Sequence, residues 1–184
     1  MEYLEETKKA MEILGKNEKT IFLGQTCRYT GSPMFASLEN VDVSKRIELP
    51  IIEDTQMGMG IGLALEGFIP ISIFPRIDFL ICTVNQLINH LDKIETMSKG
   101  EFKPKVIIRT QIGNTKPLYP GIQHCSDYTD ALKVMCKNID VIKLIEAEQI
   151  IPAYLKALES ERSTILIEVG QGGDPNRPTW EVKK

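Results

Sequence analysis

Two side chains of this sequence have the type and the position to move protons. Glu53 follows a short apolar stretch and precedes a helical pattern, with Ile51 and Ile52 beside it. His124 lies in a loop that contains Gly and Pro, ahead of another helical pattern. Histidine is the commonest acid–base side chain, and a carboxyl group among apolar neighbours can also exchange protons. By spacing alone, a structural role is favoured over a catalytic one for both residues. Glu53 would stabilise a helix N-terminus, and His124, as a single loop histidine, would be solvated or would cap a helix.

A run of alternating glycines at positions 58, 60 and 62 invites a nucleotide-binding interpretation. The dinucleotide fingerprint GxGxxG needs a glycine where this chain has Leu63, and no GxxxxGK[ST] phosphate loop occurs. The glycines also fall inside a helical pattern rather than at a strand-to-helix turn. Gly58 and Gly62 lie on one face of this predicted helix, where they would allow a neighbouring helix to pack closely. This interpretation is favoured over a nucleotide-binding oxidoreductase.

Composition excludes several other classes of protein. The cysteines at positions 27, 82, 125 and 136 form no CxxC pair, and two histidines are too few for a protein-built transition-metal site. The charged N-terminal segment resembles neither a signal nor a transit peptide, and no apolar run approaches the roughly 18 residues of a membrane span. A net charge of −3 offers no broad basic surface to nucleic acid. We expect reduced thiols and a cytoplasmic location.

Short apolar strands alternate with amphipathic helices along the chain. We predict strands at residues 20–24, 46–49, 69–74, 105–109, 140–145 and 164–169. We predict helices at residues 3–14, 54–65, 78–98, 128–136 and 148–160. Gly15 should end the first helix, Asp54 or Thr55 should cap the second, and residues 28–40 and 111–123 should be mostly loop.

This alternation predicts an α/β fold of three layers, doubly wound, with a mostly parallel sheet and helices on both faces. We expect one domain over residues 1–170 and an irregular tail over residues 171–184. Ligands of such sheets bind beyond the carboxyl ends of the strands. Functional side chains are therefore expected in the loops at residues 25–33, 50–56, 74–78 and 111–127.

Four segments, in order, carry a resemblance to one family. The stretch ELPIIEDTQMGMGIGLALEGFIP from Glu48 is similar to the segment DTPISE..G..G.G.G.A..G..P. Residues 78–79 (DF) and 85–89 (NQLIN) resemble a helix with the sequence FDQIVNEAAK. Residues 106–110 (VIIRT) resemble a strand with the sequence lVIRtP, and residues 123–126 (QHCS) resemble the motif QHSQ. These are motifs of 2-oxo acid dehydrogenase beta subunits and, more loosely, of transketolases. The resemblance covers residues 5–169 and implies the thiamine diphosphate-binding fold.

In that family this domain, the central one of transketolases, binds the aminopyrimidine ring of thiamine diphosphate. Glu53 falls on the glutamate that hydrogen-bonds ring nitrogen N1′, which lets the 4′-nitrogen take the proton from thiazolium C2. Phe79 falls on the aromatic residue that packs on the pyrimidine, and His124 on the histidine that faces the substrate. The resemblance thus implies Glu53 and His124 as catalytic residues, and Glu53, Ile51, Phe79 and Cys82 as cofactor-binding residues.

The chain departs from the family pattern at several polar positions. Gln25 and Thr26 stand where carboxylates are common, Cys82 where many relatives have glutamine, and Ile52 where PISE has serine. The GDG…N signature that holds magnesium diphosphate is absent from these 184 residues. The resemblance therefore implies no metal on this chain, and an alpha-like diphosphate-binding subunit that brings Mg²⁺ to a shared cofactor. We expect the helices at residues 54–65 and 78–98 to meet that partner in a hetero-oligomer.

We predict the pyrimidine-domain subunit of a heteromeric thiamine diphosphate-dependent enzyme that acts on a 2-oxo acid or ketose. Both a 2-oxo acid dehydrogenase or decarboxylase component and a transketolase-like transferase fit. The alternative is a catalytically degenerate domain that serves as an assembly or regulatory partner. Glu53 and His124 favour the enzyme, and the departures at Gln25 and Ile52 favour the alternative.

Overall fold

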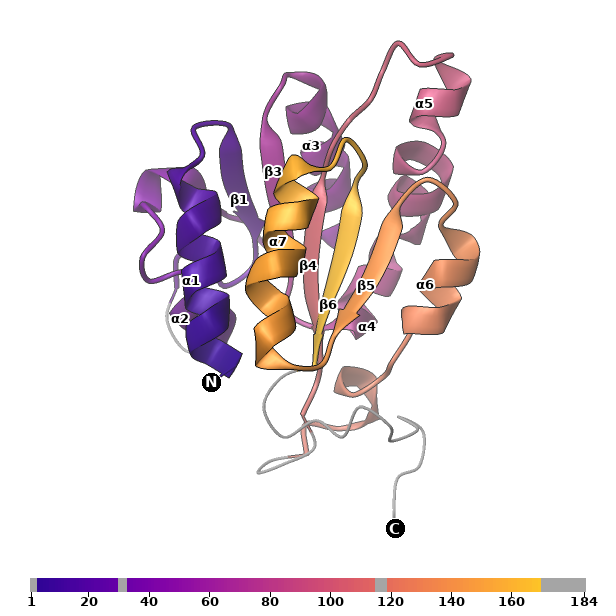
Figure 1. Ribbon diagram of the computed structural model, residues 1–184. Coiled ribbons are helices and arrows are strands. Elements are labelled where there is room, and N and C mark those ends of the chain that lie inside the picture. Colours follow the sequence, from indigo (N-terminus) through magenta and orange to yellow (C-terminus); the bar gives the residue numbers. More distant parts are fainter. Residues whose placement is uncertain (1–2, 30–32, 115–118, 170–184) are drawn as a thin grey trace.

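The computed structural model describes residues 3–29, 33–114 and 119–169, and these residues form one six-stranded sheet (Figure 1). The strands lie in the order β2-β1-β3-β4-β6-β5, and all neighbours pair in parallel. Their bounds are β1 Thr20–Gly24, β2 Arg46–Glu48, β3 Ile69–Phe74, β4 Ile107–Ile112, β5 Asp140–Leu144 and β6 Thr164–Val169. The predicted α/β class with a parallel sheet is confirmed.

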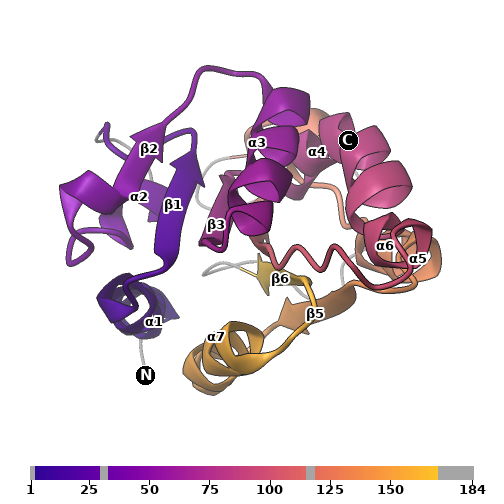
Figure 2. The ribbon, with the colours of Figure 1, turned by 90° about the horizontal axis from the view of Figure 1, so that it is seen from above.

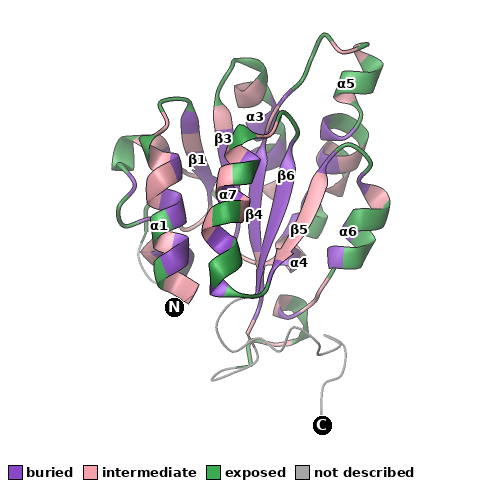
Figure 3. Cartoon of the chain, in the orientation of Figure 1, coloured by how far each residue is buried: buried purple, intermediate pink, exposed green. Residues whose placement is uncertain are grey.

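Helices cover both faces of this sheet (Figures 1 and 2). One face carries α1 (Tyr3–Lys16), α2 (Pro33–Ala36) and α7 (Ile150–Glu159). The other carries α3 (Glu53–Leu65), α4 (Ile77–Leu80), α5 (Ile94–Met97) and α6 (Thr129–Met135). Each face has its own apolar core, so strands such as β4 and β6 are buried on both sides (Figure 3). That double burial is why these strands are recognisable as continuous apolar runs.

The predicted long helix over residues 78–98 is wrong as a single element. The chain there forms α4, a 3-10 segment at Ile81–Thr83, a π-helical segment at Asn85–Leu91 and finally α5. Asp92, which follows the π-helical segment, is 3% exposed and accepts hydrogen bonds from the backbone N–H groups of Lys137 and Asn138 at 2.8 and 2.7 Å. We attribute the wider helical turns to this tertiary anchor, which periodicity cannot reveal.

Several boundaries also differ from their predictions. Ile52, not Asp54 or Thr55, is the N-cap of α3, so Glu53 is the first residue of the helix. Helix α1 continues past Gly15, where a Cβ would lie 3.4 Å from Val41 and the absent side chain allows close packing. The region expected to be loop contains α2, and β4 starts two residues later than predicted.

The predicted packing role of Gly58 and Gly62 is not realised within this chain. Gly60 is the buried glycine of α3, and a Cβ there would lie 3.7 Å from Val106 Cγ1. Gly58 and Gly62 are exposed, and a Cβ at Gly62 would meet no atom within 4 Å. The face of α3 that carries these two glycines therefore points away from the sheet.

The predicted irregular tail, residues 171–184, lies outside the described residues. In the part of the chain that the structure describes, no helix has both the length and the apolar composition needed to cross a bilayer.

Candidate functional site

The start of α3 is held over the carboxyl ends of β1 and β3 by a buried amide. Gln56 is 0% exposed, and its Nε2 donates to the carbonyl of Ile73 at 2.9 Å and to Ser72 Oγ at 3.1 Å. Gln56 lies three residues after Glu53, less than one helical turn. The amide therefore fixes Glu53 at the edge of the sheet where ligands of parallel α/β folds bind.

Strand β1 ends at a glycine because the neighbouring strand passes very close. Gly24 has φ +145°, and a Cβ there would lie 2.3 Å from the carbonyl oxygen of Ile73. The chain then turns so that Gln25 Nε2 donates to Glu53 Oε1 at 3.1 Å. Glu53 is half-buried. Its orientation thus depends on Gln25, one of the residues at which the chain departs from the family pattern.

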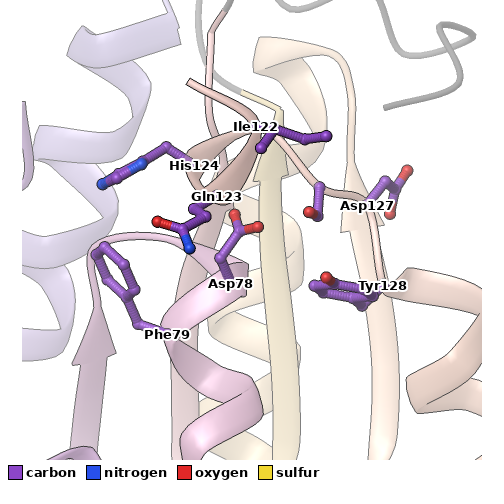
Figure 4. A pocket seen from close by; sticks show the side chains of 8 residues that line it. Asp78, Phe79, Ile122, Gln123, His124, Asp127 and Tyr128 are labelled. Carbon is purple, nitrogen blue, oxygen red and sulfur yellow. The ribbon is translucent and has the colours of Figure 1, made fainter. Parts of the chain in front are cut away.

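A pocket of about 640 Å³ opens between the start of α4 and the segment that precedes α6 (Figure 4). His124 and Phe79 lie at one end of the view, Asp127 and Tyr128 at the other, and Asp78 and Gln123 between them. The full lining is Asp78, Phe79, Ile122, Gln123, His124, Ser126, Asp127 and Tyr128. Two of the predicted site residues, Phe79 and His124, thus share one pocket.

The Phe79 and His124 rings are in direct contact. Their centroids are 5.4 Å apart and their planes make an angle of 86°, an edge-to-face arrangement. Within the described residues, His124 Nδ1 and Asp78 Oδ2 are buried and have no hydrogen-bond partner. Because buried polar atoms are normally paired, these two atoms mark places where a ligand or water can bind.

Asp127 shapes the far rim of this pocket. Its Oδ1 accepts hydrogen bonds from Thr129 N at 3.0 Å and Thr129 Oγ1 at 2.6 Å, and its Oδ2 pairs with Lys143 Nζ at 2.6 Å. Burial alone would raise the pKa of Asp127, but the bonds from Lys143 and Thr129 outweigh burial and lower the pKa. Asp127 is therefore a charged anchor for the start of α6 at neutral pH.

Gly113, just after β4, permits the loop with His124 to cross close by. A Cβ at Gly113 would lie 1.8 Å from the carbonyl oxygen of His124 and 3.1 Å from Arg76 Nε. Both contacts are shorter than van der Waals packing allows, so a side chain here must displace the loop. The glycine is what lets His124 reach Phe79.

We expect Gly113→Ala to separate the Phe79 and His124 rings and to lower the free energy of unfolding by about 1–3 kcal/mol, the usual cost of overpacking. The imidazole NMR signals of the only two histidines, His90 and His124, report the separation directly. The signal of His124 should move as the ring current of Phe79 is lost, while that of His90 stays in place. Gly62→Ala is the matched control, and an unchanged His124 signal in Gly113→Ala would contradict the argument.

Other predicted site residues lie elsewhere on the structure. Ile51 is 78% exposed and Cys82 is exposed on the 3-10 segment Ile81–Thr83. Neither residue lines the 640 Å³ pocket, and neither does Glu53. The structure brings Phe79 to His124 and Glu53 to Gln25, while cofactor contacts by Ile51 and Cys82 stay predictions.

Sequence reasoning missed several side chains of the site. They are Gln56, Asp78, Gln123, Asp127 and Tyr128. The rule that ligands bind at the carboxyl ends of strands indicated the loops at residues 74–78 and 111–127. It did not indicate which side chains there turn inward. Over residues 3–29, 33–114 and 119–169, no group of three or more His, Cys, Asp or Glu residues is arranged to hold a metal ion.

Several curated proteins are similar to this chain. The beta subunit of 3-methyl-2-oxobutanoate dehydrogenase from Mycobacterium tuberculosis is 30% identical over 138 residues, which cover 71% of this chain and 38% of that protein. The beta subunit of 2-oxoisovalerate dehydrogenase from Bacillus subtilis is 26% identical, with 79% and 44% covered. The pyruvate dehydrogenase E1 component subunit beta of Mycoplasma genitalium is 22% identical, with 90% and 51% covered. The chain thus spans about half the length of these relatives or less.

A solved structure shares the fold over almost the whole chain. It is described as a split gene transketolase, inactive beta4 tetramer, and it matches with a TM-score of 0.71 at 20% identity. The match covers 99% of this chain and 55% of that one. No protein-family model matches the sequence. The match to the solved structure confirms the fold that the sequence motifs imply.

Proposed function

Because this chain is a distant homologue of the beta subunits of 2-oxo acid dehydrogenases, we propose that it forms the aminopyrimidine-binding half of a thiamine diphosphate site. The observation that carries the proposal is the position of Glu53 at the first residue of α3, on the carboxyl edge of the sheet. The enzyme would be an oxidoreductase or transferase of the cytoplasm that acts on a 2-oxo acid or ketose. This chain would be incomplete without a partner.

The residues at this edge fit an aminopyrimidine ring. Glu53 Oε1 accepts from Gln25, and within the described residues Oε2 accepts no hydrogen bond. One carboxyl oxygen is thus available for the ring nitrogen N1′. Ile51 and Ile52 are 78% and 38% exposed and offer apolar surface next to the carboxyl group. Phe79 adds an aromatic ring for packing, worth about 0.5–1.5 kcal/mol beyond its buried area.

When bound, thiamine diphosphate supplies the carbon nucleophile that attacks a substrate carbonyl. Glu53 would hold a proton shared with N1′ and so orient the ring. His124 would bind a substrate carboxylate or carry a proton, with its orientation set by the ring contact to Phe79. Burial under a partner would exclude water and strengthen both polar interactions.

We place the diphosphate and its Mg²⁺ on an alpha-like partner subunit that meets the outward face of α3. Apolar residues are exposed on α3 and on the segments beside it, and such patches mark interfaces. They are Met59, Leu65, Phe68 and Ile81, with exposed fractions of 37–44%. Gly58 and Gly62 on the same helix are exposed and would let a partner helix approach closely.

Gly62→Ala should have opposite effects on the stability of the isolated chain and on its association with the partner. In the isolated chain we expect the free energy of unfolding to rise by about 0.5–1 kcal/mol, because alanine favours helix and no atom lies within 4 Å of the new Cβ. In the assembly the same methyl group would obstruct the partner and weaken association, as measured by analytical ultracentrifugation. Lys16→Ala, at the end of α1 on the opposite face of the sheet, is the control. Association that Gly62→Ala leaves unchanged would remove this face of α3 from the proposed interface.

The proposal as a whole is tested by cofactor binding. We expect the chain alone to bind thiamine diphosphate weakly, and a mixture with the alpha-like subunit and Mg²⁺ to bind it tightly, as measured by calorimetry. A mixture that assembles without binding the cofactor would contradict the enzyme proposal. That result would favour the assembly or regulatory role, for which the hydrogen bond from Gln25 to Glu53 is the supporting observation, because it already occupies one carboxyl oxygen.

A further inference from the structure

A second pocket, of about 760 Å³, lies beside β2 at the edge of the sheet and shares no lining residue with the first. Its lining includes two arginines, Arg28 and Arg46, and two residues that carry hydroxyl groups, Tyr29 and Ser44. Arg28 is exposed and Tyr29 is 72% exposed, so the mouth of the pocket is open to small molecules. None of these side chains has a part in the proposed thiamine diphosphate site.

Arg46 is a buried cation that forms no ion pair with any residue that the structure describes. The residue is 7% exposed, and its Nη1 donates to the carbonyl of Cys27 over a long 3.4 Å. Its Nε is buried and has no hydrogen-bond partner, and no carboxylate of the described residues lies within 4 Å of the guanidinium. Burying a charge without pairing it is costly, and buried donors are normally satisfied. Binding of an anion would relieve both costs.

Two carboxylates near Arg46, those of Glu48 and Asp42, bind backbone N–H groups and form no ion pair with it; Asp42 feels its charge only at longer range. Glu48 lines the pocket, but its Oε1 and Oε2 accept the backbone N–H groups of Thr26 and Arg28 at 2.8 and 2.7 Å. Asp42 accepts the backbone N–H of Ser44 at 2.8 Å. Glu48 thus keeps its negative charge and holds the backbone of Arg28 at the rim, but it forms no ion pair with Arg46.

We propose that this pocket binds an oxyanion, the phosphate or carboxylate group of a small molecule, between Arg46 and Arg28. The planar guanidinium group of arginine presents a fork of N–H donors that matches both groups. The hydroxyls of Ser44 and Tyr29 can supply further donors at the rim. The inference does not depend on the proposed function, because it rests on an unpaired buried cation in a separate pocket.

Titration calorimetry on the full chain tests the site with inorganic phosphate and, separately, with acetate, at an ionic strength held constant with chloride. We expect saturable binding of at least one of the two anions, and the tighter of them identifies the chemistry of the natural ligand. Arg28→Met should weaken that binding about tenfold or more, since hydrogen bonds to charged groups are strong. Lys16→Met, which also removes one positive charge but on α1, should leave the affinity within about twofold.

Arg46→Met gives a second, independent readout. Methionine fills a similar space without the unpaired charge, so we expect a chain at least as stable as the original in anion-free buffer and unable to bind the anion. Saturable binding that is equal in the original chain, Arg28→Met and Arg46→Met would overturn the proposal, and so would the absence of saturable binding of both anions. Because Arg28 is exposed, Arg28→Met decides the question even if Arg46→Met does not fold.

Discussion

Glu53→Gln is expected to slow proton exchange at C2 of bound thiamine diphosphate by about 10²–10⁴-fold in the assembled enzyme, the range typical of a lost proton-transfer group. Glutamine has nearly the same shape as glutamate and can still accept the hydrogen bond from Gln25, which is 3.1 Å away. It cannot hold the proton that a carboxyl group shares with N1′. The side chain is half-buried at the first residue of α3, so the fold should persist.

Exchange of the C2 proton for deuterium, followed by NMR after quenching, measures this effect directly. Glu66→Gln changes the same functional group in an exposed residue just beyond the other end of α3 and should leave the rate unaltered. Thermal unfolding of both variants checks that neither loses structure. A Glu53→Gln enzyme that exchanges C2 at the original rate would refute the role assigned to this carboxyl group.

The largest effect on stability is expected at the buried ion pair of Arg109 and Glu168. Arg109 is 2% exposed, and its Nε and Nη2 donate to Glu168 at 2.8 and 3.0 Å. Ser37 Oγ accepts from Arg109 Nη1 at 2.7 Å, and the Tyr154 hydroxyl donates to Glu168 Oε1 at 2.6 Å. Burial, together with Glu168, raises the pKa of Tyr154, so the phenol is protonated and remains a donor. One network thus joins β4, β6, α7 and the turn after α2.

Arg109→Met should lower the free energy of unfolding by about 3–5 kcal/mol, because Glu168 is left charged and buried without its counter-ion. The double variant Arg109→Met, Glu168→Met should recover most of that loss, since two apolar side chains can fill the space without a desolvation cost. Urea denaturation of the original chain, the single variants Arg109→Met and Glu168→Met, and the double variant yields the coupling energy between the two residues.

The exposed pair Lys16 and Glu12 on α1 is the matched control. Its nitrogen–oxygen distance is 2.9 Å, similar to that of the buried pair, but the lysine side chain is 72% exposed. Lys16→Met should therefore change the free energy of unfolding by less than about 1 kcal/mol. A loss of similar size in Arg109→Met and Lys16→Met would show that burial of the ion pair does not determine its contribution.

The sequence was most informative where a segment is buried on both sides. The runs at residues 69–74 and 164–169 are apolar because each strand contacts helices on both faces, and both were placed at their observed bounds. Their alternation with helices was enough to predict a parallel sheet, and a parallel sheet presents its ligand edge at the carboxyl ends of the strands. That rule and the family motifs indicated the segments that carry Glu53, Phe79 and His124, and the structure brings Phe79 and His124 into contact.

The sequence was least informative where one residue has a distant partner. Nothing local shows that Asp92 binds the backbone at Lys137 and Asn138, the contact to which we attribute the π-helical turns within the predicted helix over residues 78–98. Likewise, the charge of Arg109 gives no sign that it is buried beside Glu168, 59 residues away.

By itself, then, the sequence determined the class of fold and the edge of the sheet where chemistry is expected, because apolar periodicity and the alternation of strands with helices are visible in short stretches of chain. Only the tertiary structure decided that Gly113 lets His124 meet Phe79, that Gln25 holds Glu53, and that the buried Nε of Arg46 has no hydrogen-bond partner among the described residues. These features depend on distances between segments far apart in the chain, and such distances are set by packing of the whole domain.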